Sequence, residues 1–139
     1  MQTFLPYSDP LQSARCLDFR RLGKQRVEAL QILNVLHGKT TGWANHPAVK
    51  MWQGYEGYLA VYMNAMCFEW TVRGYKDTVS GRYGYPELMD VVTPHWLGDK
   101  AFHLSHKSNL MRKFPTHYSK WFGALRDDLP YIWPIGATS

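Results

Sequence analysis

The most regular hydrophobic pattern of the chain lies between Asp18 and His37. Apolar residues recur there at steps of three and four, at Leu22, Ala29, Leu30, Leu33 and Leu36. This spacing places them on one face of an α-helix. Gly38 follows directly and suits the left-handed position at which many helices end. The pattern therefore predicts a helix over residues 18–37.

A second and longer apolar pattern follows the sequence Asn45-His46-Pro47. Asn45 suits a helix cap, and proline suits the first helical position. Apolar residues then form a wide face as far as about Arg73, interrupted by Gly54 and Gly57. We expect one long central helix over residues 47–73, whose small residues let a neighbouring helix approach closely.

The chain before these helices, and the stretch after them, are less regular. Prolines restrict the first ten residues to an extended or turn-like path. Ser8 or Asp9 can cap a short helix that is entered through Pro10. Residues 74–98 are rich in Gly and Pro, which indicates a loop with one short helix at 86–91.

The last third of the chain combines one helix with an aromatic tail. Asp99 is expected to cap a helix over residues 100–114, which Pro115 stops. Residues 116–134 are expected to be irregular and to wrap back over the core. No segment shows the alternation typical of a strand. The sequence thus predicts an all-α, compact single-domain helical fold with long irregular loops over residues 1–139.

The composition supports a folded domain of one hydrophobic core. The chain has 139 residues, of which 45% are hydrophobic, and this is enough for a core of its own. No apolar run approaches the roughly 18 to 20 residues of a membrane span, and the start carries no signal peptide. We therefore expect a cytoplasmic protein without membrane contact. Cys16 and Cys67 are expected to be free thiols in a reducing compartment.

Charge and aromatic content favour an anionic partner. The formal net charge is +5, and the chain has six Trp, nine Tyr and six Phe. A small basic domain most often binds nucleic acid, and spare aromatic rings can stack on bases. These features favour nucleic acid over a membrane surface.

Two helices carry groups that suit this partner. The helix at 18–37 presents Arg20, Arg21, Lys24, Arg26 and Glu28, where cations can bind phosphates and keep the carboxylate ionised. The helix at 100–114 presents Lys100, His103, His106, Lys107, Arg112 and Lys113. On pattern alone, both sets are equally consistent with solvated helix faces and ordinary ion pairs.

Metal and cofactor motifs are absent from the sequence. His103 and His106 are spaced for one face of a helix, but no third ligand has motif spacing. The chain has no phosphate-binding G-x-x-x-x-G-K-[ST], no G-x-G-x-x-G, no C-x-x-C and no H-E-x-x-H. We expect metal-free, cofactor-free chemistry or binding alone.

Several segments together resemble the pyrimidine-dimer DNA glycosylase family typified by phage endonuclease V, in a bacterial-type branch. The matching segments are Leu17 to Leu30, Gly42-Trp43-Ala44-Asn45-His46-Pro47, Arg73-Gly74-Tyr75, His106 to Asn109, Arg112-Lys113 with Pro115 and Tyr118, and Leu129 to Pro134. The resemblance implies an all-helical enzyme that flips a nucleotide, cleaves a glycosidic bond and nicks the backbone by β-elimination. It also implies that the nucleophile is the α-amine of the chain.

The family's second essential group is a glutamate on the first long helix. One register makes Glu28 its match, and a register through Phe19-Arg20-Arg21 places Arg21 there instead. An α-amine suits the nucleophile because α-amines titrate near pH 7.7 to 8.0, far below a lysine. The amine belongs to Met1, because Gln2 is bulky and disfavours removal of Met1, or to Gln2 if Met1 is lost. A loose N-terminal tail is the alternative.

By resemblance, the partner is double-stranded DNA bound by a monomeric protein. The expected DNA-binding residues are Gln2, Arg20, Arg21, Lys24, Arg26, His46, His106, Lys107, Arg112, Lys113, Tyr118 and Trp121. For His46 the alternative role is to cap a helix. The second hypothesis for the whole chain is a helical nucleic-acid-binding module without catalysis, and a third is a structural or toxin-antitoxin-type interaction protein.

Overall fold

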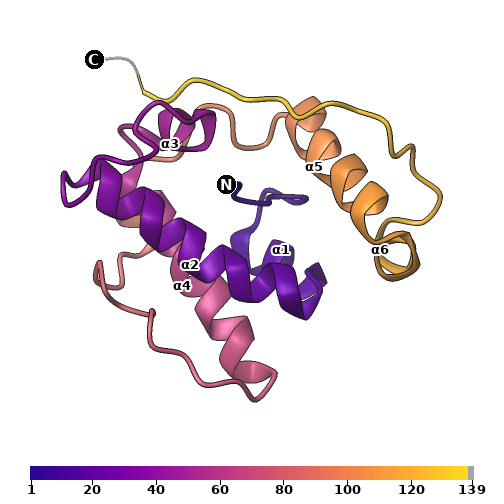
Figure 1. Cartoon of the computed structure of the whole chain (residues 1–139), viewed down its shortest axis with the longest axis horizontal. Coiled ribbons are helices and arrows are strands. Elements are labelled where there is room, and N and C mark those ends of the chain that lie inside the picture. Colours follow the sequence, from indigo (N-terminus) through magenta and orange to yellow (C-terminus); the bar gives the residue numbers. More distant parts are fainter. Residues whose placement is uncertain (138–139) are drawn as a thin grey trace.

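Two long helices, α2 (Phe19–Leu36) and α4 (Glu56–Val72), pack against each other. They lie side by side in the computed structural model, which describes residues 1–137 (Figure 1). The contact is close because Gly23 has no side chain: a Cβ there would lie 3.0 Å from the ring of Trp70. The expected amphipathic helix is present. The close approach uses Gly23 of α2, and not Gly54 or Gly57, which face Ala137 and Val91 instead.

Four shorter helices complete the fold of residues 1–137. They are α1 (Pro10–Cys16), α3 (Pro47–Trp52), α5 (Lys100–Lys113) and α6 (Pro115–Phe122), with a single 3₁₀ turn η1 at Leu88–Asp90. α1 packs on α4, and α5 packs on α6. The described residues contain helices and loops but no strand, so the predicted all-α class is confirmed.

Aspartate side chains start three of the helices. Asp9 accepts a hydrogen bond from the N–H of Leu11 at the start of α1, and Asp99 accepts one from Phe102 at the start of α5. Asp18 caps α2 in the same way. Of the two candidates for the first cap, the structure uses Asp9. Each cap satisfies N–H groups that a helix start leaves without intrahelical partners.

The prediction of one long helix over residues 47–73 is wrong. α3 ends at Trp52 and α4 begins at Glu56, because Gly54 adopts a left-handed conformation with φ of 86°. The carbonyl of Gln53 accepts a hydrogen bond from Ala137 of the distant C-terminal segment instead of continuing a helix. His46, not Asn45, is the cap residue of α3, and its Nδ1 accepts from the N–H of Ala48 at 3.0 Å.

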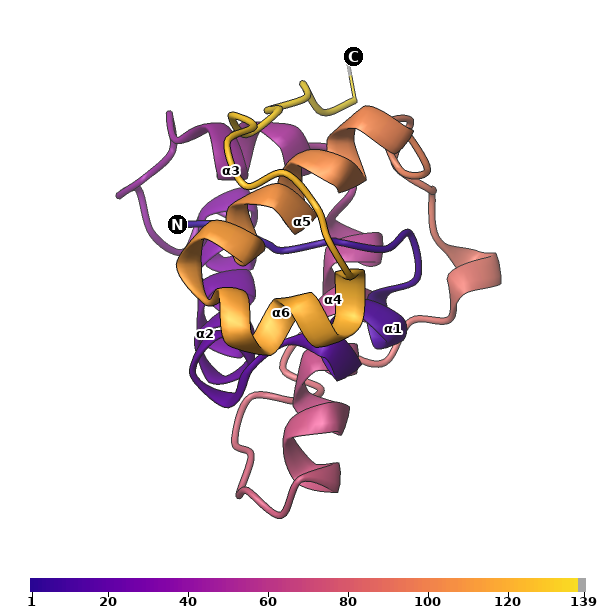
Figure 2. The ribbon, with the colours of Figure 1, turned by 90° about the vertical axis from the view of Figure 1, so that its right-hand side faces the viewer.

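The expectation of an irregular chain directly after Pro115 is also wrong. Pro115 begins α6 rather than only ending α5, since proline is well suited to the first helical position. Residues 123–137, here called the C-terminal strap, are irregular and do wrap back over the core (Figure 2). The strap bonds to α5 through Leu129 and Ile132, and it reaches α3 through Gly136.

Both cysteines are buried and unpaired, as expected. Burial raises the pKa of each thiol to about 12, so neither is a reactive thiolate near neutral pH. Among the described residues, no helix is long and apolar enough to cross a membrane.

Candidate active site

A cavity of about 450 Å³ lies where the N-terminal segment, α2, the end of α5 and the C-terminal strap meet. Seven residues expected from the sequence line it: Met1, Gln2, Arg20, Arg21, Lys24, Glu28 and Lys113. Four further lining residues were not expected: Phe4, Gln25, Tyr131 and Trp133. The structure thus gathers the chain terminus, one carboxylate and four cationic side chains around a single space.

The N-terminal segment is fixed in the core and is not a loose tail. The N–H of Phe4 donates to Gln25 Oε1 at 2.7 Å, and the hydroxyl of Tyr62 lies 2.9 Å from the carbonyl oxygen of Phe4. The indole N–H of Trp52 donates to the Thr3 hydroxyl at 2.9 Å. All of these groups are buried and cannot bond to water. The three hydrogen bonds therefore satisfy polar groups that would otherwise lack a partner.

Two histidines of α5 hold the next residue of this segment. The N–H of Leu5 donates to His106 Nδ1 at 2.8 Å, and His103 Nδ1 donates to the carbonyl of Leu5 at 2.7 Å. His103 Nε2 in turn accepts from the N–H of Gly98. Burial lowers the pKa of His106 to about 3, so its ring is neutral. The expectation that His106 binds phosphate is therefore wrong, because this ring is buried and uncharged.

Glu28 meets the start of the chain inside the cavity. The backbone N–H of Gln2 donates to Glu28 Oε2 at 2.9 Å, and the amide of Gln25 donates to the same oxygen at 3.2 Å. α2 brings this about because Gln25 and Glu28 are three residues apart and share a helix face. The first residue, Met1, is partly buried against the core. Its α-amine is thus one residue from the carboxylate contact.

The side chain of Gln2 also contributes to the cavity. Its Oε1 accepts from the N–H of Thr3 at 2.8 Å. Its Nε2 is buried and has no hydrogen-bond partner within residues 1–137. A buried donor without a partner is costly, and it becomes satisfied when a ligand with an acceptor atom enters the space.

Cationic side chains surround the same space. Arg20 and Lys24 are exposed, and Arg21 forms an ion pair of 3.0 Å with the helix cap Asp18. Partial burial lowers the pKa of Lys113, and the nearby charges of Arg21 and other cations lower it further. Arg20, Arg21, Lys24 and Lys113 all line the one cavity, and such a group of cations can bind a phosphate group.

His46 lies next to this cavity without lining it. Its ring packs edge-on against Trp133 at 5.9 Å between centroids, and Trp133 lines the cavity. Burial lowers the pKa of His46, the chain's amino terminus lowers it further, and Glu28 acts in the opposite direction. His46 is thus both a helix cap and a packing partner of the cavity residue Trp133.

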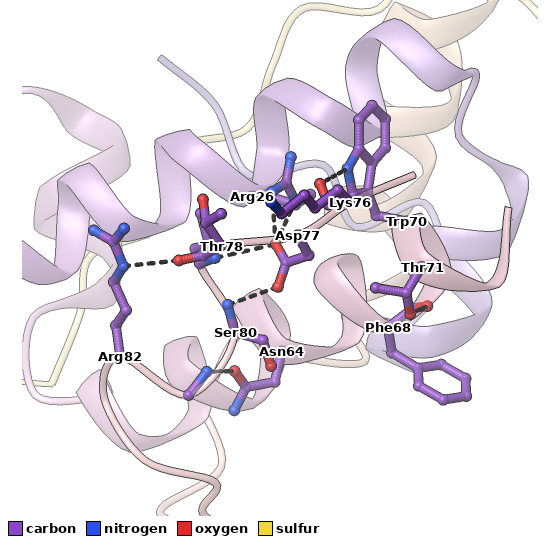
Figure 3. Close-up of polar contacts among 12 residues, drawn as sticks. Arg26, Asn64, Phe68, Trp70, Thr71, Lys76, Asp77, Thr78, Ser80 and Arg82 are labelled. Carbon is purple, nitrogen blue, oxygen red and sulfur yellow. Dashed lines mark hydrogen bonds and ion pairs between the residues drawn. The ribbon is translucent and has the colours of Figure 1, made fainter. Parts of the chain in front are cut away.

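Arg26 is buried and paired within the protein, which contradicts the expectation that it binds DNA. Its guanidinium forms a buried ion pair of 2.6 Å with Asp77 and lies over the ring of Trp70 at 4.8 Å (Figure 3). Asp77 also accepts hydrogen bonds from the N–H groups of Val79 and Ser80. Arg26 therefore fixes the loop after α4 against α2.

Two other predicted cations are directed elsewhere. The ammonium of Lys107 lies 4.8 Å from the ring centre of Tyr7 and 5.7 Å from that of Phe122. Arg112 donates to the carbonyl of Asp127 in the C-terminal strap and to the side chain of Asn109. Neither residue lines the cavity.

Of the two predicted aromatic contacts, Tyr118 is fully buried. Its hydroxyl donates to Asp18 Oδ1 at 2.5 Å and accepts from the N–H of the same residue. It therefore joins α6 to the start of α2 and cannot stack on a base, so that prediction is wrong. Trp121, one turn later on α6, is 47% exposed. Its contact with DNA stays a prediction.

The described residues hold no group of three His, Cys, Asp or Glu side chains that could bind a metal ion. Of the cavity residues that were not expected, Gln25 has a signal in the sequence, since it precedes Glu28 by three positions on one helix face. Phe4, Tyr131 and Trp133 reach the cavity through long-range packing that no local pattern encodes.

A carboxylate and several cations around one cavity are features of a protein that acts on an anionic polymer. One protein family matches the chain. The family described as "Pyrimidine dimer DNA glycosylase" matches residues 1–81, more than half of the chain, and the protein belongs to that family. This makes it a member of a DNA repair glycosylase family whose substrate is DNA. No curated protein and no solved structure matches it.

Proposed function

We propose that this protein is a DNA glycosylase with AP-lyase activity that excises a damaged or modified pyrimidine through an N-terminal α-amine and Glu28. The observation that carries the proposal is the bond of 2.9 Å between the backbone nitrogen of Gln2 and Glu28 Oε2, at the edge of a cationic cavity. It supports the register that assigns Glu28 over the one that assigns Arg21, since Arg21 is paired with Asp18.

The chemistry begins with the amine. The lone pair of the unprotonated α-amine attacks C1′ of the extruded nucleotide, and the glycosidic bond breaks with its electron pair leaving on the base. The departing base takes up a proton from water. The nitrogen loses one of its two protons, and O4′ takes up a proton as the C1′–O4′ bond breaks and the sugar ring opens. The product is an iminium, which is a Schiff base between the chain terminus and C1′.

Glu28 then acts on the iminium. Its carboxylate stabilises the positive charge of this intermediate and accepts the proton of C2′. Elimination follows, in which the electrons of the C2′–H bond form a double bond and the C3′–O bond breaks toward the phosphate. Water hydrolyses the iminium and restores the amine. This sequence of steps consumes no oxidant or reductant and uses no metal ion.

The cationic side chains have a separate part. Arg20, Arg21, Lys24 and Lys113 can hold the phosphates that flank an extruded nucleotide, since arginine and lysine bind phosphate through charge-assisted hydrogen bonds. The free amide of Gln2 can donate to an oxygen of the substrate. Gln2 is held near this position, because bonds from α2, α4 and α5 fix the N-terminal segment.

The amine itself can belong to either of two residues. With Met1 retained, the nucleophile is the amine of Met1, which lines the same cavity as Glu28. With Met1 removed, the amine would be the nitrogen of Gln2, already bonded to Glu28. That amine could be lost by cyclisation with its own side chain.

Trapping with borohydride tests the proposal. The protein is incubated with duplex DNA that carries an abasic site, in the presence of sodium borohydride, and covalent complexes are separated by denaturing electrophoresis. A reducible protein–DNA adduct is expected, because borohydride converts the iminium to a stable amine. A protein that binds the duplex but gives neither adduct nor strand cleavage would be a non-catalytic binding module instead.

A further inference from the structure

Trp43 lies in the loop between α2 and α3 and does not line the cavity described above. It is 62% exposed, and it is the one residue other than glycine with a positive φ, 69°, within residues 1–137. A bulky side chain is rarely found in this left-handed conformation. A large apolar ring held in solvent by an unfavourable backbone conformation is an uncommon combination in a surface loop.

The ring of Trp43 begins a series of aromatic contacts that ends in the cavity. Trp43 packs edge-on against His46, with 5.8 Å between centroids, and His46 packs on Trp133 at 5.9 Å. Trp133 contacts Tyr131 at 5.5 Å, and both line the cavity. Trp43 is therefore the solvent-exposed end of one wall of the site.

The loop also lies on the side of the molecule where DNA would approach. All residues from 37 to 45 are exposed. Figure 2 shows the loop between α2 and α3 projecting beyond the N-terminus on the same side of the molecule. A duplex whose extruded nucleotide enters the cavity would therefore meet this loop next to the point of extrusion.

We propose that Trp43 stacks on a base of the duplex beside the extruded nucleotide. Extrusion costs a few kcal/mol of lost stacking, and an aromatic ring that takes up part of the exposed base surface offsets this cost. On the protein side the ring contacts His46 edge-on, and most of its surface stays free for a base. The inference rests on the proposed function, because it requires DNA with an extruded nucleotide at the cavity.

The test compares cleavage of an abasic site in duplex DNA with cleavage of the same site in a single strand, under single-turnover conditions below saturation. Trp43→Asn removes the ring, and asparagine tolerates the left-handed backbone. This variant is expected to cleave the duplex about 5- to 100-fold more slowly, from the usual contribution of one base–aromatic stack, and the single strand at an unchanged rate. Trp43→Phe is expected to recover most of the duplex rate.

The control is Phe68→Ala. Phe68 is 56% exposed on α4 and lies outside the cavity lining, so its loss should leave both rates unchanged. An unchanged ratio of duplex to single-strand cleavage in Trp43→Asn would overturn the inference, as would an equal loss on both substrates.

Failure of the proposed function would look different. In that case the wild-type protein would cleave neither substrate, and the inference is then decided by affinity for a duplex with a non-cleavable abasic analogue. A loss of about 5- to 100-fold in Trp43→Asn would support stacking. Equal affinity of the variant and the wild type would overturn it.

Discussion

His106 Nδ1 accepts a hydrogen bond of 2.8 Å from the backbone N–H of Leu5, which joins residues 101 positions apart in the chain. Through this contact and that of His103, α5 sets the position of the N-terminal segment, and thereby of the nitrogen that meets Glu28. A residue that the sequence suggests as a phosphate ligand instead holds the chain terminus in the site.

The neutral ring of His106 predicts acid sensitivity. Its pKa is about 3 in the folded protein, lowered by burial and then by His103, against a usual value of 6.5. Between about pH 3 and pH 6.5 the ring is protonated in the unfolded chain but neutral in the folded protein. Protonation therefore favours unfolding, so this contribution to stability is complete above pH 6.5 and is lost as the pH falls below it. The urea midpoint should drop between pH 7 and pH 4.5.

The matched variant is His106→Asn, whose Oδ1 can still accept from Leu5. It should show a smaller drop over the same pH range, whereas His37→Asn, at the exposed end of α2, should behave like the wild type. If His106→Asn and the wild type lose stability in parallel, other groups control the acid transition.

Arg26 and Arg20 are on the same helix but should respond differently to substitution. Arg26→Ala leaves the buried Asp77 without its partner, and breaking a buried ion pair in this way costs about 3 to 5 kcal/mol of the free energy of unfolding. Urea denaturation measures this loss. A stability within about 0.5 kcal/mol of the wild type would show that the loop after α4 does not depend on the pair.

Arg20→Ala and Lys24→Ala should leave stability nearly unchanged and weaken DNA binding. Each lost phosphate contact reduces the slope of log affinity against log salt by about one unit. The measurement is a titration of abasic-analogue duplex at several salt concentrations. Lys50→Ala, an exposed lysine on α3 outside the cavity lining, is the control. Unchanged affinity and slope in both cavity variants would place the DNA elsewhere.

Glu28→Gln should abolish strand cleavage while leaving affinity for the duplex almost unchanged. The amide oxygen of glutamine can still accept from the N–H of Gln2, so the geometry is kept and only the ionisable group is lost. Gel assays of nicking at an abasic site measure the effect, with Glu87→Gln in the exposed loop as control. Wild-type nicking by Glu28→Gln would remove Glu28 from the mechanism.

The sequence predicts those parts of the structure that depend on local spacing. The periodicity at Leu22, Leu33 and Leu36 and the glycine at position 38 are local signals, and α2 follows them. The end of α3 and the start of α4 around Gly54 are not predictable from local spacing. They depend in part on the carbonyl of Gln53, which accepts a hydrogen bond from the C-terminal strap.

The same limit applies to the site. Arg20 and Arg26 are both arginines on one helix, so their sequence context does not show that they differ. Arg26 is buried because it pairs with Asp77, which is distant in the sequence. Tyr118 and Trp121 are one helical turn apart, yet the pairing of Tyr118 with Asp18 buries only the first. Glu28 could be predicted as a site residue from the sequence. Three of the cavity cations and most of the family-like segment Leu17 to Leu30 lie on the same helix. Tyr131 and Trp133 enter the cavity through the strap, whose path is set by tertiary contacts.

The most direct test of the account identifies the amine that carries the adduct. The borohydride-trapped complex is digested with nuclease and protease, and the modified peptide is sequenced by mass spectrometry. Lys24 and Lys113 line the same cavity and are the competing amines, and the pKa of Lys113 is lowered by burial and neighbouring cations. The proposed mechanism requires a sugar remnant on the α-amine of the first residue of the mature chain. A remnant on Lys24 or Lys113 would contradict it.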